Sequence, residues 1–132
     1  MPPSSSKKIL LVDDDVFLLD MYAMKFTKAG YEVKTADSTE SGIKVIRDGY
    51  VPDIMLVDIV MPGLDGLELV SSVRKDRLAP NAVVIMLTNQ GSSDDVARSR
   101  KLNVDGYIVK ATTIPSEVLS EVEKICASKK SP

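Results

Sequence analysis

Residues 54–58 read IMLVD, four apolar residues in a row that end on a carboxylate. The run predicts a strand over Ile54–Val57, because so short and unbroken an apolar stretch is typical of a strand that is covered on both faces, as in a parallel sheet. Comparable runs predict four further strands, over Ile9–Val12, Glu32–Ala36, Ala82–Leu87 and Tyr107–Val109. Because the segments between these runs favour helices, the pattern predicts parallel pairing through crossover helices.

Apolar residues recur at helical spacing in four of the intervening segments. The residues that define them are Leu18, Leu19, Tyr22 and Phe26; Ile43 and Ile46 after a Ser38 cap; Leu67, Val70 and Val73; and Val118, Leu119, Val122, Ile125 and Cys126. The segment Ser92–Asn103 offers little more than Val96, Ala97 and Leu102, which predicts a weakly anchored helix. Five such units within 132 residues suit an open doubly wound α/β sheet, since a barrel needs about twice the length.

The chain length predicts one domain over residues 8–128. Residues 1–7 are expected to be a loose leader, and residues 129–132 a tail or the start of a linker.

Composition excludes several classes of function. The sequence contains no His, so imidazole bases, His triads and His metal ligation are ruled out. Seventeen Lys and Arg against nineteen Asp and Glu give a net charge of −2, which favours neither nucleic acid nor a membrane surface as a partner. The single Cys126 cannot form an internal disulfide, and it is interpreted as a packing residue in a protein of the reducing cytoplasm.

Polar residues follow four of the predicted strands, where a sheet of this class binds its ligands. They are Asp13, Asp14 and Asp15, then Asp58, Thr88 and Lys110. Taken singly, each has a structural explanation, such as a helix cap or a solvated charge. Taken together, clustered carboxylates must bind protons or a cation, because they repel one another.

Mg²⁺ suits this set, because it prefers carboxylate oxygens and leaves positions for phosphate oxygens. Thr88 and Lys110 could then hydrogen-bond and neutralise a phosphoryl group, and Asp58 is the candidate nucleophile that would form an aspartyl phosphate. Because no glycine-rich phosphate loop follows the first strand, a bound nucleotide is not the expected phosphoryl donor.

Four motifs in order, ILLVDDD, IMLVDIVMPGLDG, VIMLT and GYIVKA, resemble the receiver domain of two-component response regulators. The similarity runs from about Lys8 to Ser128. It implies a flavodoxin-like sheet of order 2-1-3-4-5. It also implies that Asp58 is phosphorylated by a phosphohistidine of a sensor kinase or a histidine phosphotransfer protein.

The resemblance further assigns individual roles. Asp13, Asp14, Asp58 and the main-chain carbonyl of Val60 would bind Mg²⁺, while Thr88 and Lys110 would contact the phosphoryl group. Tyr107 would be an aromatic switch. The fourth helix, fifth strand and fifth helix would form the output surface for a target protein or effector domain, and dimerisation on phosphorylation is common in the family.

The sequence departs from the family pattern around the site. Ala111 replaces the usual Pro after the lysine, which predicts a trans or strained peptide beside Lys110. Asn89 replaces a small residue, which predicts restricted access to the phosphoryl group. Val60 and Gln90 occupy the two variable positions that influence dephosphorylation. Since an apolar Val60 cannot orient a water molecule, we predict a long-lived phosphoryl group.

Two other functions remain open at this point. One is a receiver-like interaction module that acts without phosphorylation. The other is a haloacid-dehalogenase-like phosphatase, suggested by Asp13-x-Asp15, although the chain is short and Phe17 stands where that family has Thr. The basic residues Arg98, Arg100 and Lys101 are interpreted as a solvated helix surface.

Overall fold

The computed structural model describes residues 7–59, 61, 65–88, 93–109 and 114–130. These residues form five parallel strands in the order β2-β1-β3-β4-β5 and five helices that alternate with the strands along the chain. The elements are β1 (Lys8–Val12), α1 (Val16–Lys28), β2 (Glu32–Ala36), α2 (Thr39–Arg47), β3 (Ile54–Asp58), α3 (Gly66–Lys75), β4 (Val83–Thr88), α4 (Ser93–Lys101), β5 (Gly106–Val109) and α5 (Pro115–Lys130). The predicted fold class and strand order are confirmed.

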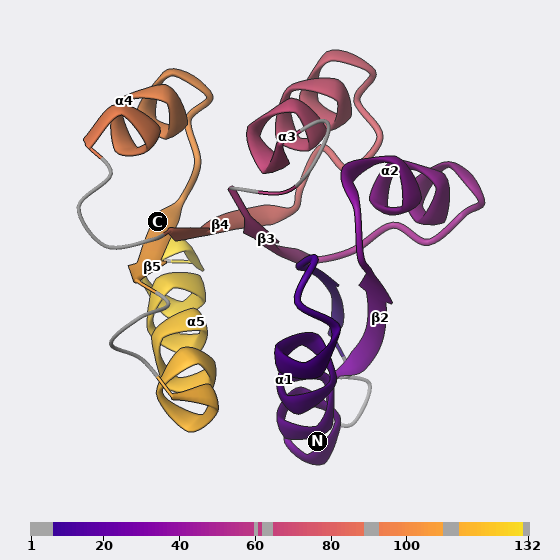
Figure 1. The fold of residues 1–132 in the computed structure, drawn as a ribbon, viewed down its shortest axis with the longest axis vertical. Coiled ribbons are helices and arrows are strands. Elements are labelled where there is room, and N and C mark those ends of the chain that lie inside the picture. Colours follow the sequence, from indigo (N-terminus) through magenta and orange to yellow (C-terminus); the bar gives the residue numbers. More distant parts are fainter. Residues whose placement is uncertain (1–6, 60, 62–64, 89–92, 110–113, 131–132) are drawn as a thin grey trace.

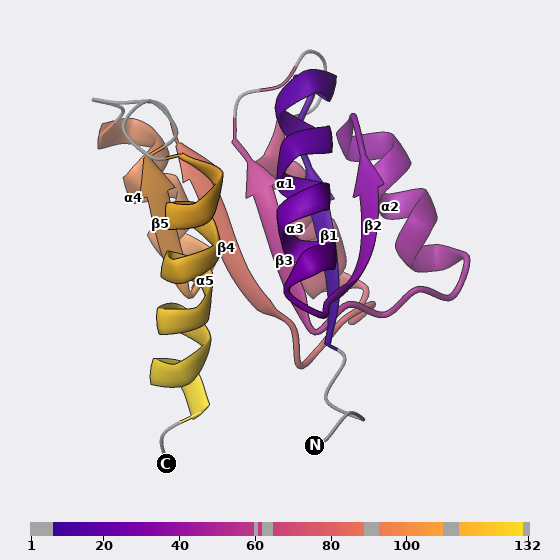
Figure 2. The ribbon, with the colours of Figure 1, turned by 90° about the horizontal axis from the view of Figure 1, so that it is seen from below.

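Helices cover both faces of the sheet. Figure 1 shows α1 and α5 on one side of the strands and α2, α3 and α4 on the other. The view in Figure 2 shows that all five strands point the same way, so their carboxyl ends share one edge.

The two-residue repeat of a strand sorts the core into two clusters. On β1, Ile9 and Leu11 face the α1 and α5 side, whereas Leu10 and Val12 face the α2 and α3 side. All four side chains are at most 1% exposed. Burial on both faces therefore explains why the central strands read as unbroken apolar runs. At the sheet edge, β2 keeps mostly exposed side chains.

Local capping fixes where three of the helices begin. Asp15, Ser38 and Asp65 each accept a hydrogen bond from a main-chain N–H in the first turn of α1, α2 and α3, respectively. The predicted Ser38 cap is confirmed, and the structure extends it to a capping box with Ser41. Asp65 caps α3, the helix that follows the strand ending at Asp58.

The strand and helix limits differ from the predicted ones by a few residues. β3 and β4 each include one more residue at the carboxyl end, Asp58 and Thr88. The last helix continues to Lys130, into the segment expected to be a tail, because no Pro or Gly interrupts it before that point.

The inner face of α4 differs from the prediction. Ala97 is exposed, and Ser99 is completely buried in its place. Leu102, just after the helix, is half-buried against the core. A serine on the buried face contributes less apolar contact than Ala97 was expected to share. The side chain of Val96, which was also expected on this face, lies outside the described residues.

Cys126 packs in the α1 and α5 cluster and is 8% exposed, which confirms its place on the core stripe of α5. None of the helices in the described ranges has the length and apolar character needed to cross a bilayer.

Candidate functional site

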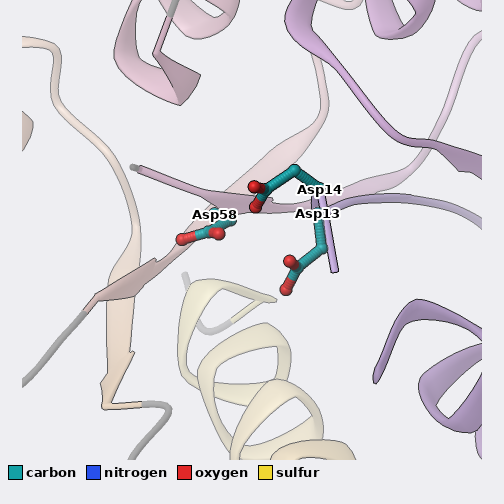
Figure 3. A group of neighbouring side chains, drawn as sticks. All are labelled: Asp13, Asp14 and Asp58. Atoms are coloured by element: carbon teal, nitrogen blue, oxygen red, sulfur yellow. The ribbon is translucent and has the colours of Figure 1, made fainter. Parts of the chain in front are cut away.

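Three carboxylates meet at the carboxyl edge of the sheet. Asp13 and Asp14 follow β1, and Asp58 ends β3; each offers one carboxylate oxygen, and these oxygens all lie within 4.8 Å of one another. Figure 3 shows the three side chains gathered in front of the two strand ends. The predicted convergence of these three residues is therefore present in the structure.

Strand register produces this convergence. Val12 pairs with Val57, so the next residue on each strand, Asp13 and Asp58, emerges at the same level of the sheet. Asp13 continues the row of Ile9 and Leu11, and Asp58 continues the equivalent row on β3, so both belong to the α1 and α5 face.

Main-chain hydrogen bonds hold Asp13 in place. Its N–H donates to the carbonyl of Ala36 on β2 at 3.1 Å. Its Oδ1 accepts from the N–H of Asp15 at 2.9 Å. The side chain is thus oriented by the neighbouring strand and by the first turn after β1.

The grouping of two buried carboxylates with an exposed one suits a small hard cation. Asp13 is fully buried and Asp58 is 3% exposed, whereas Asp14 is exposed. Oδ2 of Asp13 is buried, and it accepts no hydrogen bond within the part of the chain that the structure describes. Two buried anions beside a third are mutually repulsive, and a divalent cation with oxygen ligands relieves that repulsion.

Gly66 brings the start of α3 against the main chain of Asp58. Its N–H donates to the carbonyl of Ile59 at 2.8 Å. A Cβ at this position would stand 2.0 Å from the carbonyl oxygen of Asp58, closer than any side chain tolerates. Only glycine fits here, and the contact fixes α3 relative to Asp58.

Thr88 and Tyr107 lie on the other face of the sheet. Thr88 ends β4 at the same edge as Asp58 and is 3% exposed. Tyr107 pairs with Met86 on β5 and packs, half-buried, against the cluster on the α2, α3 and α4 side. Thr88 continues the row of Val84 and Met86, so it shares that face with Tyr107.

Several predicted residues fall outside this description or have another role. Lys110 and Val60 lie outside the described residues, as do the departures at positions 89, 90 and 111. Asp15 caps α1 by accepting from the N–H of Leu18 at 3.1 Å, so its structural explanation holds.

One residue of this edge was missed by sequence reasoning. Asp65 caps α3 and also forms an ion pair with Arg98 of α4. The pattern Asp65-x-x-Glu68 before an apolar run is a capping-box signature and could have identified the cap. The ion pair with a distant helix leaves no signal in the sequence.

Comparison with known proteins identifies the family of the chain. The sequence model of a family described as "Response regulator receiver domain" matches residues 9–123. The chain belongs to this family. As a receiver domain it is a signalling domain of two-component systems.

One of the relatives is about as long as this chain, and another is about twice as long. The chemotaxis protein CheY of Halobacterium salinarum is 32% identical over 121 residues, which are 89% of this chain and 97% of that protein. The phosphate regulon transcriptional regulatory protein PhoB of Pseudomonas aeruginosa is 34% identical over 119 residues, which are 90% of this chain and 51% of PhoB. This receiver domain therefore spans about half the length of PhoB, and nearly the whole of CheY.

Solved structures confirm the fold. A CheY-like receiver domain protein from Methanospirillum hungatei matches with a TM-score of 0.83 and 32% identity, covering 96% of this chain and 98% of that one. The chemotaxis response regulator CheY4 of Vibrio cholerae matches with a TM-score of 0.82 and 26% identity, covering 92% and 99%.

Proposed function

We propose that Asp58 accepts a phosphoryl group from a phosphohistidine of a sensor kinase or histidine phosphotransfer protein. The observation that carries the proposal is the meeting of the Asp13, Asp14 and Asp58 carboxylates within 4.8 Å at the sheet edge. A carboxylate oxygen of Asp58 would attack phosphorus, and the phosphorus–nitrogen bond of the donor would break with its electron pair passing to the imidazole. The product is an aspartyl phosphate, so the domain acts on itself rather than turning over a substrate.

Asp13, Asp14 and Asp58 are the side chains that would hold Mg²⁺, with the main-chain carbonyl of Val60 as a further ligand. When bound, the ion would offset the charge of the carboxylates and orient a phosphoryl oxygen. The burial of Asp13 and Asp58 supports this role, because a water-poor site strengthens the attraction between the carboxylates and a cation.

Thr88 and Lys110 would bind the phosphoryl oxygens. The position of Thr88 supports its part, because it ends β4 beside the end of β3. Tyr107 and Thr88 share the face that α4 covers, so a movement of the Thr88 hydroxyl would open space for the Tyr107 ring. The surface of α4, β5 and α5 would then change and bind a target protein or effector domain.

The α1 surface supports a protein as the phosphoryl donor. Phe17, Met21 and Met24 form a row along one side of α1 and are 78%, 38% and 62% exposed. Exposed apolar residues in such a row are a candidate contact for another protein. The row begins shortly after Asp14, next to the site that a phosphohistidine must reach. A sensor kinase or phosphotransfer protein as partner would place the domain in the cytoplasm.

Intact mass after incubation with Mg²⁺ and acetyl phosphate tests the proposal. We expect a gain of one phosphoryl mass in the wild type and none in Asp58→Asn. The exposed Asp20 on α1 provides a matched control, and Asp20→Asn should be phosphorylated like the wild type. An unmodified wild type would favour the alternative, a receiver-like interaction module that works without phosphorylation.

A further inference from the structure

Asp65 divides its two carboxylate oxygens between two helices. Oδ1 accepts from the N–H of Glu68 at 3.1 Å and caps α3. Oδ2 accepts from Nη2 of Arg98 on α4 at 2.7 Å. The two helices lie over the same face of the sheet (Figure 1), and this carboxylate joins the start of α3 to the last turn of α4.

The same residue is tied closely to Asp58. Gly66, the next residue along the chain, lies against the carbonyl of Asp58 without room for a Cβ. The carbonyl of Asp65 also accepts from the hydroxyl of Thr39 at the start of α2, at 3.0 Å. The Asp65 carboxylate is therefore held in a fixed position relative to Asp58.

The described part of α4 has little apolar anchoring. Ala97 is exposed and the fully buried side chain is that of Ser99. At the far end, Nη2 of Arg74 on α3 donates to the carbonyl of Asn103 at 3.0 Å. Within the described residues, an arginine contact at the start of α3 and another in the turn after α4 thus join α4 and this turn to α3.

We propose that Arg98 is a positioning residue that couples the state of Asp58 to α4 through its ion pair with Asp65. The inference rests on the proposed function. Thr88 lies on the strand that leads into α4, whereas Asp65 is fixed to Asp58. A phosphoryl group that draws Thr88 inward would shift α4 relative to Asp65 and weaken the ion pair.

The exposure of the Arg98–Asp65 ion pair sets how strongly its loss should change the opening of α4. The Arg98 side chain is 49% exposed and that of Asp65 is 22% exposed, so water screens the attraction. A pair of this kind changes an equilibrium by about two- to fivefold. That is enough to alter the population of an open form of α4, because helices with little apolar packing already open locally.

Hydrogen exchange of the α4 amides in the unphosphorylated protein tests the contact itself. We expect Arg98→Gln and Asp65→Asn each to speed exchange about two- to fivefold, and the double variant to exchange no faster than Arg98→Gln alone. Asn still caps helices well, so Asp65→Asn removes the charge and keeps the cap. Arg98→Lys should restore most of the protection.

The matched control is a second cross-helix ion pair, Arg47 with Asp76, which joins α2 to the end of α3. Arg47→Gln removes the same kind of contact and should leave α4 exchange unchanged. Unchanged exchange in Arg98→Gln, or effects that add in the double variant, would overturn the proposal.

The coupling is tested by repeating the exchange after incubation with Mg²⁺ and acetyl phosphate, with intact mass recorded on the same samples. Phosphorylation should speed α4 exchange in the wild type and have little further effect in Arg98→Gln. An equal response of the two proteins refutes the coupling while leaving the phosphoacceptor role intact. If the wild type gains no phosphoryl mass, the proposed function and the coupling both fail.

Discussion

Gly66→Ala is the perturbation whose cost the structure specifies most directly. The added Cβ would stand 2.0 Å from the carbonyl oxygen of Asp58 and 2.7 Å from Cγ1 of Val57. Relief of these contacts requires the start of α3 to move by about 1.5 Å away from β3, because non-bonded atoms pack at about 3.5–4 Å. Overpacking of a buried site costs about 1–3 kcal/mol. Alanine favours helix over glycine by only about 1 kcal/mol, and less in a first turn.

We therefore expect Gly66→Ala to lower the free energy of unfolding by about 2 kcal/mol in urea denaturation at equilibrium. The fraction that remains folded should also react more slowly with acetyl phosphate, since Asp58 shares the displaced backbone. Gly42→Ala on α2 is the matched control. There the nearest atom is a Leu69 side-chain carbon at 3.3 Å, which can shift, so the change should stay within about 1 kcal/mol. Equal stability of Gly66→Ala and the wild type would refute the close contact between α3 and Asp58.

Four further outcomes are expected. Burial and the nearby carboxylates of Glu32 and Asp53 raise the pKa of Tyr50 from 10.0 to about 12, so the folded state holds the phenol proton more tightly than the unfolded state does. The stability that this gives is complete below pH 10 and is lost as the pH rises to 12. Tyr50→Phe should lower the free energy of unfolding by about 1 kcal/mol at neutral pH and flatten its decline at alkaline pH in urea titrations. Cys126→Ser should lower the free energy of unfolding by about 1–2 kcal/mol through burial of a hydroxyl, with unchanged phosphorylation in the intact-mass assay, and lost phosphorylation would argue against a packing role. In Asp14→Asn, the rise in melting temperature on adding Mg²⁺ should shrink, whereas an undiminished rise would place the ion elsewhere. Val60→Asn should shorten the lifetime of the phosphoryl group, and a faster loss from the wild type would contradict the reasoning from an apolar side chain.

Apolar runs were sufficient to predict the central strands, because these strands are buried on both faces, whereas the strand order came from the resemblance to receiver domains. Leu56 and Val57 on β3 are neighbours in sequence yet belong to opposite core clusters, and only a doubly covered strand requires apolar residues at both positions. The apolar run also predicts the position of Asp58, because the residue that ends such a strand lies at the carboxyl edge of the sheet. The meeting of Asp13, Asp14 and Asp58 could therefore be predicted without tertiary information.

Contacts between helices could not be predicted in this way. Arg98 carries the same signal in the sequence as any solvated basic residue, and its partner lies 33 residues away on another helix. The complete burial of Ser99 was also missed, because a small polar residue carries no periodic apolar signal. Such features depend on how helices pack over the sheet, which the pattern of a single segment does not encode.

The central claim is that the clustered carboxylates bind Mg²⁺ and thereby allow Asp58 to attack a phosphoryl donor. The most direct measurement locates the phosphoryl group by peptide mapping after incubation with acetyl phosphate, with Mg²⁺ present or removed by a chelator. The account predicts modification on the peptide that contains Asp58, in the presence of Mg²⁺ only. A phosphoryl group on another residue, or equal modification of Asp58 after Mg²⁺ removal, would contradict it.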